Sequence, residues 1–460
     1  MLTKDSQHDR TLNYVLTGWK MPNIKYDSLY PNKQSFRTLL KVGLVANIFE
    51  YYELAMFSYM AQIIAQLFFS SASQSDALLK TLATFSLSYL SKPLGAFYFG
   101  HLGDRYGKKL ALKRSMMMMA LPVTLVGLLP TWHTGGTLAT CLLACLRIMQ
   151  GFASGGEGPI SISYVSEAAS LKHRSLLCSS VHISALLGML SASGVSTLLF
   201  HYFSEAEILA WAWRIPFLIN IPATIGISWI RRAVIDFPQQ INTHAIAQNP
   251  KHANQTQQAI VPIKLWKASP QQTIATLLIA SFFMATAHIL LGGWFTIYLV
   301  ENFGYAKDVV NITHTIALST RVLFCTAAAY LARFVGPKPL MISSLVLSTG
   351  FIIPFFKLLS DHPPFMSLLG IYILFILLLS GIDGIFVERM ASLFSQDAQC
   401  RGMSWHYTGL STFFGSTTVV LCSYMVNGVG IQFFPCFYLL FWGTLASFAV
   451  YLMLRSERPS

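Results

Sequence analysis

The chain has 460 residues, of which 54% are hydrophobic and only 11% carry a charge. Soluble domains carry roughly 25% charged residues, so this sequence cannot cover a water-facing surface in the usual way, and an ordinary soluble domain is excluded. The formal net charge of +13 is compatible with a nucleic-acid partner. The basic residues, however, gather in the N-terminal tail and in alternate loops, as they do in membrane proteins. We therefore expect a lipid bilayer as a partner and no nucleic acid.

The predicted elements begin with a polar, basic tail over residues 1–37, which lacks the early apolar core of a cleavable signal. After it, about twelve apolar runs approach or exceed the roughly 20 residues that cross a bilayer. The runs are continuously apolar and do not alternate, which indicates helices instead of barrel strands. We therefore expect an all-α integral membrane protein. The expected spans are residues 39–68, 79–100, 110–130, 138–165, 176–201, 211–230, 272–300, 309–331, 339–358, 366–387, 403–426 and 432–454.

The spans fall into two groups of six, predicted to form an N-terminal bundle over residues 38–231 and a C-terminal bundle over residues 271–455. Between them, residues 232–270 are rich in Gln, Asn and His and are predicted to be a cytoplasmic linker. Residues 456–460 form a short C-terminal tail. The charge of alternate loops predicts that both termini lie in the cytoplasm and that the protein spans the cell (inner) membrane. We expect a monomer, because one chain already contains both bundles.

Residues 100–109, with the sequence GHLGDRYGKK, form a short basic turn between the second and third spans. Positive charge in so short a loop resists translocation, which predicts a cytoplasmic position. The pattern G-x-L-x-D-R-x-G-K-K resembles the signature loop of the major facilitator superfamily, and we call these residues the signature loop. A degenerate copy, AYLARFVGPKP, follows the eighth span at residues 329–339, where Arg333 takes the place of the acidic residue. The resemblance implies the major facilitator fold, with twelve helices in two six-helix bundles, built from repeats.

Three further segments resemble one branch of that superfamily, the metabolite:proton symporters, which include proline/betaine and dicarboxylate carriers. They are NIFEYYELAMF at residues 47–57, RIMQGFASGGE at 147–157 and WRIPFL at 213–218. Glu53 stands where the family usually has Asp, and Lys92 replaces a common Arg. The resemblance implies secondary active transport by alternating access. We expect proton-coupled uptake of a small organic acid, amino acid or betaine-like solute, with the proton as coupling ion and no cofactor.

Several charged residues lie inside apolar runs, where each costs about 2.5–3.5 kcal/mol on insertion scales. They must therefore face one another or a water-filled cavity. Glu50 and Glu53 are three residues apart and share one helical face. Their mutual repulsion in a low dielectric favours a proton on one of them, whereas a fixed ion pair with Lys92 or Arg147 is the alternative. The proton-coupling candidates are Glu50, Glu53, Arg147 and Glu157. The resemblance implies that Arg147 belongs to a proton or conformational relay, with Glu157 in the same helix–helix network.

The candidates for contact with the solute are polar or aromatic residues of the apolar runs. Arg321 is the first candidate, because it lacks a nearby acid in the sequence; an ion pair with Asp383 or a first-helix glutamate is the alternative. Aromatic side chains suit a quaternary ammonium group through cation–π contact, although aromatics are equally expected at bilayer interfaces. The full set is Arg321, Tyr52, Lys92, Asp383, His288, Trp294 and Tyr407.

The resemblance also implies a gate at the signature loop. Asp104 is expected to accept hydrogen bonds from the amides of a helix N-terminus and to pair with a nearby arginine. Arg105, Glu167 and Arg174 are expected to form a charge cluster that closes the inner end in one state. The gating candidates are Gly100, Asp104, Arg105, Gly107, Lys108, Glu167 and Arg174.

Two other functions stay open. One is export of drugs or siderophores on the same fold, and the other is a non-transporting membrane receptor or sensor. An enzyme is not expected, because no His, Asp and Glu cluster has catalytic spacing. The seven cysteines show no metal-ligand spacing either, so no metal site is expected.

Overall fold

The computed structural model describes residues 36–45, 47–69, 74–170, 173–231, 265–290 and 294–456. Most of the predicted N-terminal tail and linker, and nearly all of the C-terminal tail, lie outside the described residues. The described residues are almost entirely helical. An isolated antiparallel bridge joins Trp266 to Phe394.

The first half of the chain supplies six spans, several of them broken. Its elements are α2 (Phe36–Val45), α3 (Ile48–Tyr59), α4 (Ala61–Phe68), α5 (Gln74–Tyr106), α6 (Lys108–Leu128), α7 (Trp132–Ala168), α8 (Arg174–Tyr202), α9 (Glu205–Ala210), η2 (Ala212–Arg214), α10 (Ile215–Leu218) and α11 (Asn220–Arg231).

The second half of the chain supplies the other six spans. Its elements are α13 (Pro270–Leu290), α14 (Trp294–Phe303), α15 (Lys307–Val335), α16 (Pro337–Ser360), α17 (Phe365–Asp383), α18 (Phe386–Ser392), η4 (Gln396–Ala398), α19 (Gln399–Ser423), η5 (Tyr424–Gly428) and α20 (Phe434–Ser456).

Within the described ranges, nine helices are long and apolar enough to cross a membrane by length and composition alone. The three other predicted spans fall on α2–α4, on α5 and on α10–α11. These helices are too short or too polar to count among the nine. The first and sixth spans are interrupted into short helices. The second, α5, carries Lys92 and runs on into the charged signature loop, which lowers its mean hydropathy. The twelve predicted spans therefore all correspond to helices of the structure.

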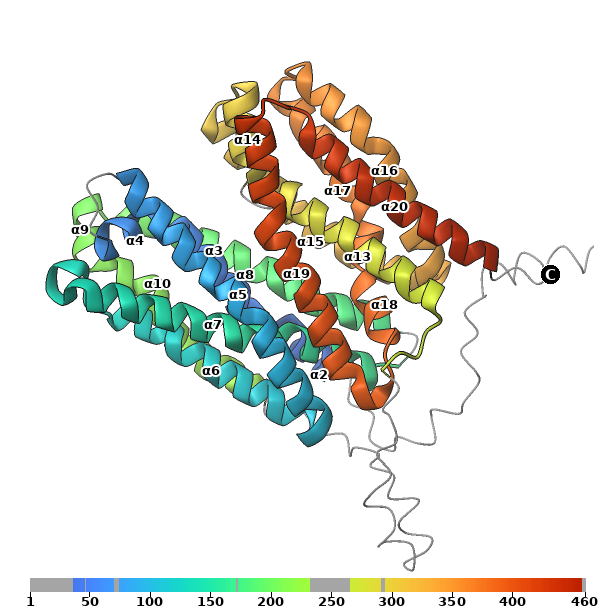
Figure 1. The fold of residues 1–460 in the computed structure, drawn as a ribbon, viewed down its shortest axis with the longest axis horizontal. Helices are drawn as coiled ribbons and strands as arrows, with labels where there is room; N and C mark the ends of the chain where they lie inside the picture. The colour runs from blue at the N-terminus through green and yellow to red at the C-terminus, as the bar shows by residue number, and fades with distance from the viewer. Residues whose placement is uncertain are drawn as a thin grey trace, which may run out of the picture.

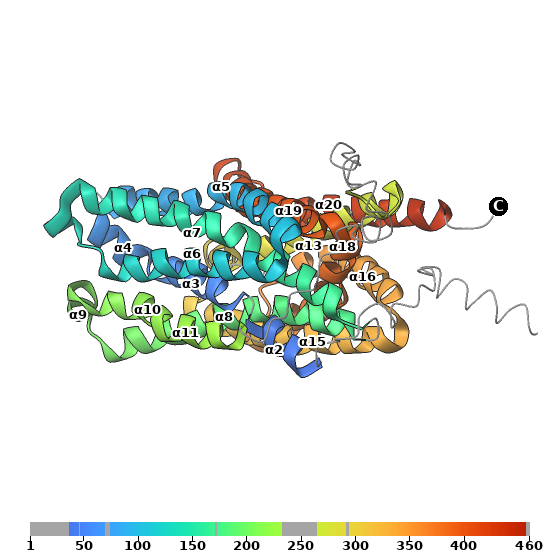
Figure 2. The same cartoon turned by 90° about the horizontal axis from the view of Figure 1, so that it is seen from below.

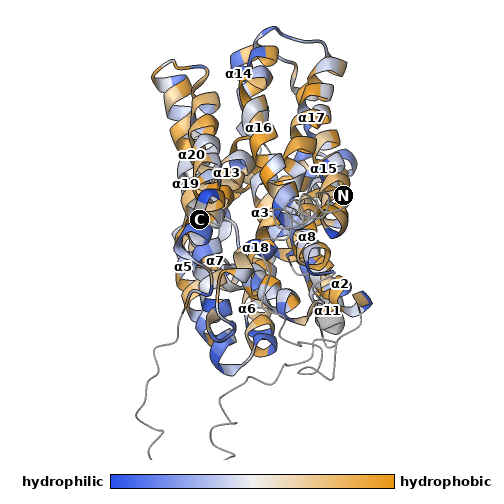
Figure 3. Cartoon of the chain, turned by 90° about the vertical axis from the view of Figure 1, so that its right-hand side faces the viewer, coloured by the Kyte–Doolittle hydropathy of each residue, from blue (hydrophilic) through white to orange (hydrophobic). Residues whose placement is uncertain are grey.

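The two halves form two bundles, which meet mainly through α5 and α7 against α19 and through α8 against α15. Figure 1 shows the ribbons of the bundles converging toward α2 and α18 and diverging toward α4 and α14. Seen from below, the spans run side by side along the molecule (Figure 2). Hydropathy colouring shows mostly hydrophobic spans, with hydrophilic residues gathered near α6 (Figure 3). We call the converging end, which carries residues 100–109, the signature-loop end.

Close packing of α5 against α7 depends on glycine. A Cβ on Gly151 would overlap the carbonyl oxygen of Ser88, and a Cβ on Gly155 would overlap that of Lys92. Small residues let two helix backbones approach closely in a membrane. This approach fixes the helix that bears Lys92 beside the helix that bears Arg147.

The two halves repeat one backbone detail. Gly107 separates α5 from α6 with φ +98°, and Gly336 separates α15 from α16 with φ +92°. Glycine adopts a positive φ at little steric cost. The degenerate copy of the signature loop has thus lost its acidic residue but kept its turn.

Candidate functional site

Two buried ion pairs lie at the centre of the first bundle, and both acids come from α3. The Nζ atom of Lys92 lies 2.8 Å from Oε1 of Glu50. Arg147 binds the carboxylate of Glu53, and its Nη1 lies 2.7 Å from Oε1 of Gln150. Buried charges must be paired to offset the cost of leaving water. The structure therefore shows the fixed ion pairs that the sequence left as an alternative to a free carboxylate.

A small cavity of about 10 Å³ lies beside the first of these pairs, between the two bundles. It has room for about one water molecule. Glu50, Tyr51 and Lys92 line it from the first half, and Tyr407 and Ser411 line it from the second. The Nζ of Lys92 also lies 4.9 Å from the ring centroid of Tyr89. The cavity walls thus carry one acid, one base and two tyrosines, Tyr51 and Tyr407, although in this conformation the space is too small for a solute. It lies where α3, α5 and α7 of one bundle face α19 of the other.

Tyr52 and Trp294 were expected at this cavity but pack elsewhere. The Tyr52 hydroxyl donates to the carbonyl of Pro216 at 2.9 Å, inside the first bundle. The Trp294 Nε1 donates to Ser423 Oγ at 2.6 Å, inside the second bundle. The neighbouring residue Tyr51, one position along α3, lines the cavity instead.

Neither His288 nor Glu157 is among the residues that line this cavity. The Nδ1 of His288 lies 2.7 Å from the carbonyl oxygen of Met284, one helical turn earlier. Glu157 is fully buried in α7. It stands ten residues from Arg147, or about 15 Å along the helix at 1.5 Å per residue. Arg147 pairs with Glu53 of α3, and Glu157 lies about three turns further along α7.

The second bundle holds its own buried ion pair. Arg321 on α15 binds Asp383 on α17 through Nε at 2.6 Å and through Nη2 at 3.1 Å. This is the fork geometry that makes arginine–carboxylate pairs strong. His182 of the first bundle joins the pair, with Nε2 at 2.7 Å from Oδ1 of Asp383. The alternative that the sequence left open for Arg321 is the arrangement in the structure, while His182 was not among the candidates.

At the signature-loop end, Asp104 reaches across to the second bundle. Its carboxylate accepts the backbone amides of Cys400 at 2.9 Å and Arg401 at 3.0 Å. The Nε of Arg401 also donates to it at 3.0 Å. These amides belong to the first turn of α19, where a helix leaves its N–H groups unpaired. Asp104 therefore makes both kinds of contact expected of it.

The other charged residues of this end pair differently from the expected cluster. Glu167 binds Lys108, with its Oε2 2.6 Å from Nζ, and the same Nζ donates to Gln399 of the second half at 3.1 Å. The guanidinium of Arg105 lies over the ring of Tyr106, 5.5 Å from its centroid. Arg174 is the first residue of α8. Lys108 thus takes the place at Glu167 that the sequence had given to Arg105.

Glycine again allows the close approach at this end. A Cβ on Gly100 would lie 3.0 Å from the Cα of Arg401, which is tighter than most real contacts. Gly100 and Asp104 lie one turn apart on α5, so both meet the start of α19. In the parts of the chain that the structure describes, no three His, Cys, Asp or Glu side chains could hold a metal ion.

Comparison with known proteins identifies this architecture. Residues 43–408 match the Major Facilitator Superfamily. The chain belongs to this superfamily. Its bundles, ion pairs and signature loop are therefore those of a membrane transporter, not of an enzyme.

Named relatives share about a quarter of the sequence. The proline/betaine transporter of Escherichia coli K12 is 26% identical over 411 residues, which cover 88% of this chain and 80% of the relative. The ectoine/proline transporter ProP of Corynebacterium glutamicum is 25% identical over 441 residues, which cover 92% of this chain and 85% of the relative.

Solved structures share the fold at lower identity. The proton:xylose symporter XylE, bound to 6-bromo-6-deoxy-D-glucose, is similar with a TM-score of 0.69 at 14% identity, covering 94% of this chain and 97% of that one. A bacterial homologue of the iron transporter ferroportin in an outward-facing state is similar with a TM-score of 0.62 at 13% identity. The match covers 91% of this chain and 99% of that one.

Proposed function

We propose that this transporter takes up a small zwitterionic solute together with a proton. The observation that carries the proposal is the Glu50–Lys92 pair, 2.8 Å apart, at the cavity between the bundles. A zwitterion carries an ammonium group and a carboxylate only a few bonds apart. Its carboxylate binds Lys92 and its ammonium group binds Glu50, so that neither buried charge loses a partner.

Charge balance favours a zwitterion over a dicarboxylate. The charged side chains that line the cavity are one acid and one base. A dianion would bring two negative charges to a site whose own charges already cancel. The tyrosines at positions 51 and 407 add aromatic faces, which attract quaternary ammonium groups. Relatives named as proline/betaine and ectoine/proline transporters support this class of solute.

The coupling proton is assigned to Glu53. This carboxylate is buried with Arg147, and Arg147 also contacts Gln150. When Glu53 takes up a proton, Arg147 keeps the amide oxygen of Gln150 and the ring of Phe57, whose centroid lies 4.0 Å from its guanidinium carbon. Proton binding therefore removes the counter-charge of Arg147 but leaves it a hydrogen bond and an aromatic contact. The change of charge at this pair would distinguish the loaded carrier from the empty one.

The orientation follows from the basic loops. With the signature-loop end in the cytoplasm, the positive-inside rule is satisfied. The protein then spans the cell (inner) membrane with both termini in the cytoplasm. Asp104 and Lys108 then hold the inner end together through their contacts with Arg401 and Gln399. Residues 232–270 would connect the bundles as a cytoplasmic linker. A single chain, as a monomer, would carry out the whole cycle.

Uptake into proteoliposomes tests the proposal. The purified protein would be offered labelled proline, betaine, 2-oxoglutarate and citrate, with and without an inward proton gradient. We expect gradient-driven accumulation of proline or betaine and none of the two acids. Accumulation of 2-oxoglutarate or citrate instead would overturn the proposal that the solute is a zwitterion. Efflux against the gradient would favour an exporter, and saturable binding without flux would favour a receptor.

A further inference from the structure

One face of α8 forms a seam across the two bundles. Ser175, Ser179 and His182 are four and three residues apart, so they lie on one side of the helix. Ser175 Oγ donates to Glu388 Oε2 at 2.9 Å, and Ser179 Oγ donates to the carbonyl oxygen of Gly384. His182 makes the third contact, with Asp383. We call these three residues the α8 seam.

The other side of the seam is a break in the tenth span. Helix α17 ends at Asp383 and α18 begins at Phe386. A helix end leaves carbonyl oxygens without partners inside the helix. The carbonyl of Gly384 is one of these, and Ser179 of the first bundle binds it. The break therefore supplies acceptors at the place where the bundles touch.

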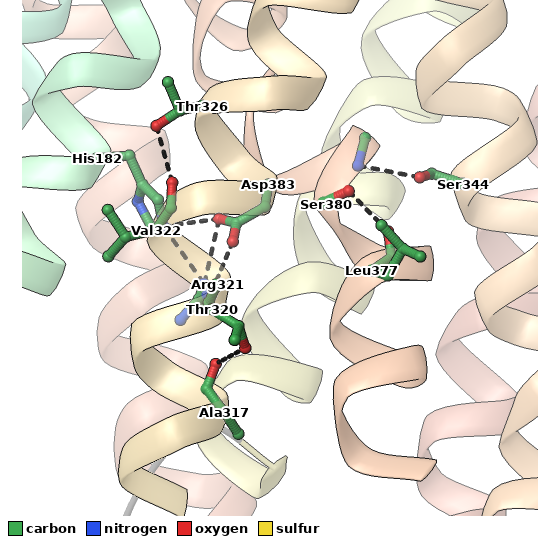
Figure 4. Close-up of polar contacts among 11 residues, drawn as sticks. His182, Ala317, Thr320, Arg321, Val322, Thr326, Ser344, Leu377, Ser380 and Asp383 are labelled. Atoms are coloured by element: carbon green, nitrogen blue, oxygen red, sulfur yellow. Dashed lines mark hydrogen bonds and ion pairs between the residues drawn. The ribbon is translucent and has the colours of Figure 1, made fainter. Parts of the chain in front are cut away.

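The contact between His182 and Asp383 is a hydrogen bond in which His182 donates. A carboxylate only accepts hydrogen bonds, and Nε2 of His182 lies 2.7 Å from Oδ1 of Asp383. Nε2 must therefore carry a hydrogen. Nη2 of Arg321 lies 3.3 Å from the same Nε2 and 3.1 Å from the same Oδ1 (Figure 4). His182 and Arg321, from opposite bundles, thus share one carboxylate oxygen.

The contact can break without leaving a buried charge alone. Arg321 and Asp383 both belong to the second bundle, and Nε of Arg321 lies 2.6 Å from Oδ2 of Asp383. The Glu50–Lys92 and Glu53–Arg147 pairs are likewise internal to the first bundle. His182 differs, because its hydrogen bond joins the two bundles. Separating the bundles here removes one donor from Asp383 and preserves the ion pair, so the step avoids the large penalty for an unpaired charge.

We propose that His182 is a latch: its hydrogen bond to Asp383 stabilises the state in which the signature-loop ends of the bundles are closed, and it breaks once in each transport cycle. The proposal rests on the alternating-access part of the proposed function and not on the identity of the solute. His182 is a positioning residue in this role, because it acts through Asp383 and need not touch the solute.

Distances between two spin labels test the latch in the full-length protein. Labels would be placed at Arg114→Cys on α6 and Ser343→Cys on α16, both exposed. The exposed native Cys141 and Cys145 would be replaced by serine, and so would Cys400, which opening of the signature-loop end would expose to the label. In the parent protein we expect a dominant short distance. In His182→Ala, loss of a hydrogen bond to a charged group should raise the ratio of long to short distances by roughly tenfold or more.

Two amide variants separate the latch from a simple packing role. His182→Gln keeps an N–H donor near the position of Nε2 and should retain the short distance. His182→Asn ends too early to reach Asp383 and should open as the alanine variant does, which also keeps the test valid if alanine fails to fold. An unchanged distance in both Ala and Asn, or a Gln variant as open as Asn, would overturn the latch. A lack of proline or betaine uptake would instead count against the proposed solute and leave these distances unaffected.

Discussion

The carboxylate of Asp104 binds Arg401 twice, through its backbone amide and through its Nε, each at 3.0 Å from Oδ2. A loop of the first bundle thereby holds the first turn of a helix in the second. An acid at a helix N-terminus is stabilised both by the free amides and by the helix dipole. The signature loop is therefore a joint between the bundles as well as a turn between two spans.

Removing the charge of Asp104 should loosen this joint. Asp104→Asn loses the ion pair with Arg401 and one acceptor for the amides of α19, and we expect a cost of about 1–3 kcal/mol. Cys400, fully buried beneath the contact, should then react faster with a thiol reagent in native membranes. Asp361→Asn, at an exposed acid that caps the end of α16, is the matched control. Equal labelling of Cys400 in parent and Asp104→Asn would count against the joint.

Glu53 and Glu50 should affect transport in different ways. In Glu53→Gln the proposed proton site is lost, so accumulation should no longer respond to a proton gradient while exchange of labelled for unlabelled solute continues. In Glu50→Gln the ammonium partner is lost, so KM should rise and the response to the gradient should remain. Flux assays with and without a gradient separate the two effects. If the two variants behave alike, the separate roles are wrong.

Lys92 is expected to bind the carboxylate of the solute. Lys92→Gln removes a charge-assisted hydrogen bond worth about 1.5–3 kcal/mol, which corresponds to roughly a 10- to 150-fold rise in KM for betaine. Lys92→Arg keeps the charge and should retain much of the affinity. Choline, which lacks the carboxylate, serves as the control ligand. Its binding should not weaken in Lys92→Gln, because the substitution leaves Glu50 free for the ammonium group. A parallel loss for choline and betaine would contradict the carboxylate contact.

Gly155 should be intolerant of a methyl group, because a Cβ there overlaps the backbone of Lys92. We expect Gly155→Ala to lower the free energy of unfolding by about 1–3 kcal/mol through overpacking. Gly194 on α8 has open space at the same position and is the matched control. Gly194→Ala should be neutral or stabilising, since alanine favours helix more than glycine by about 1 kcal/mol. Thermal unfolding of the purified variants provides the comparison, and equal midpoints would contradict the packing argument.

The sequence predicted the spans and the signature loop because each depends on local pattern. A run of about 20 apolar residues marks a span wherever it falls, and the loop is defined by ten consecutive residues. Contacts between residues that are distant in the sequence cannot be predicted from such local patterns. Asp104 was expected to meet a helix N-terminus, yet nothing local in residues 100–109 indicates that Arg401 lies there.

His182 shows what local pattern cannot supply. It lies among apolar and small residues of α8, and Arg321 is 139 positions away in the chain. Tyr51 and Tyr52 pose a similar problem, since the sequence cannot tell which of two adjacent tyrosines faces the cavity. The rotation of α3 decides, and that rotation is set by packing against α8. Sequence therefore predicted the kinds of residue at the site better than their individual neighbours.

Proton movement driven by solute tests the central claim most directly. Proteoliposomes without any imposed gradient would be mixed with proline or betaine in a weakly buffered medium that contains a pH-sensitive dye. We predict that the outside becomes more alkaline as solute and protons enter together, and that Glu53→Gln abolishes this change. Entry of solute without any change of pH, or an undiminished change in Glu53→Gln, would contradict proton coupling at the Glu53–Arg147 pair.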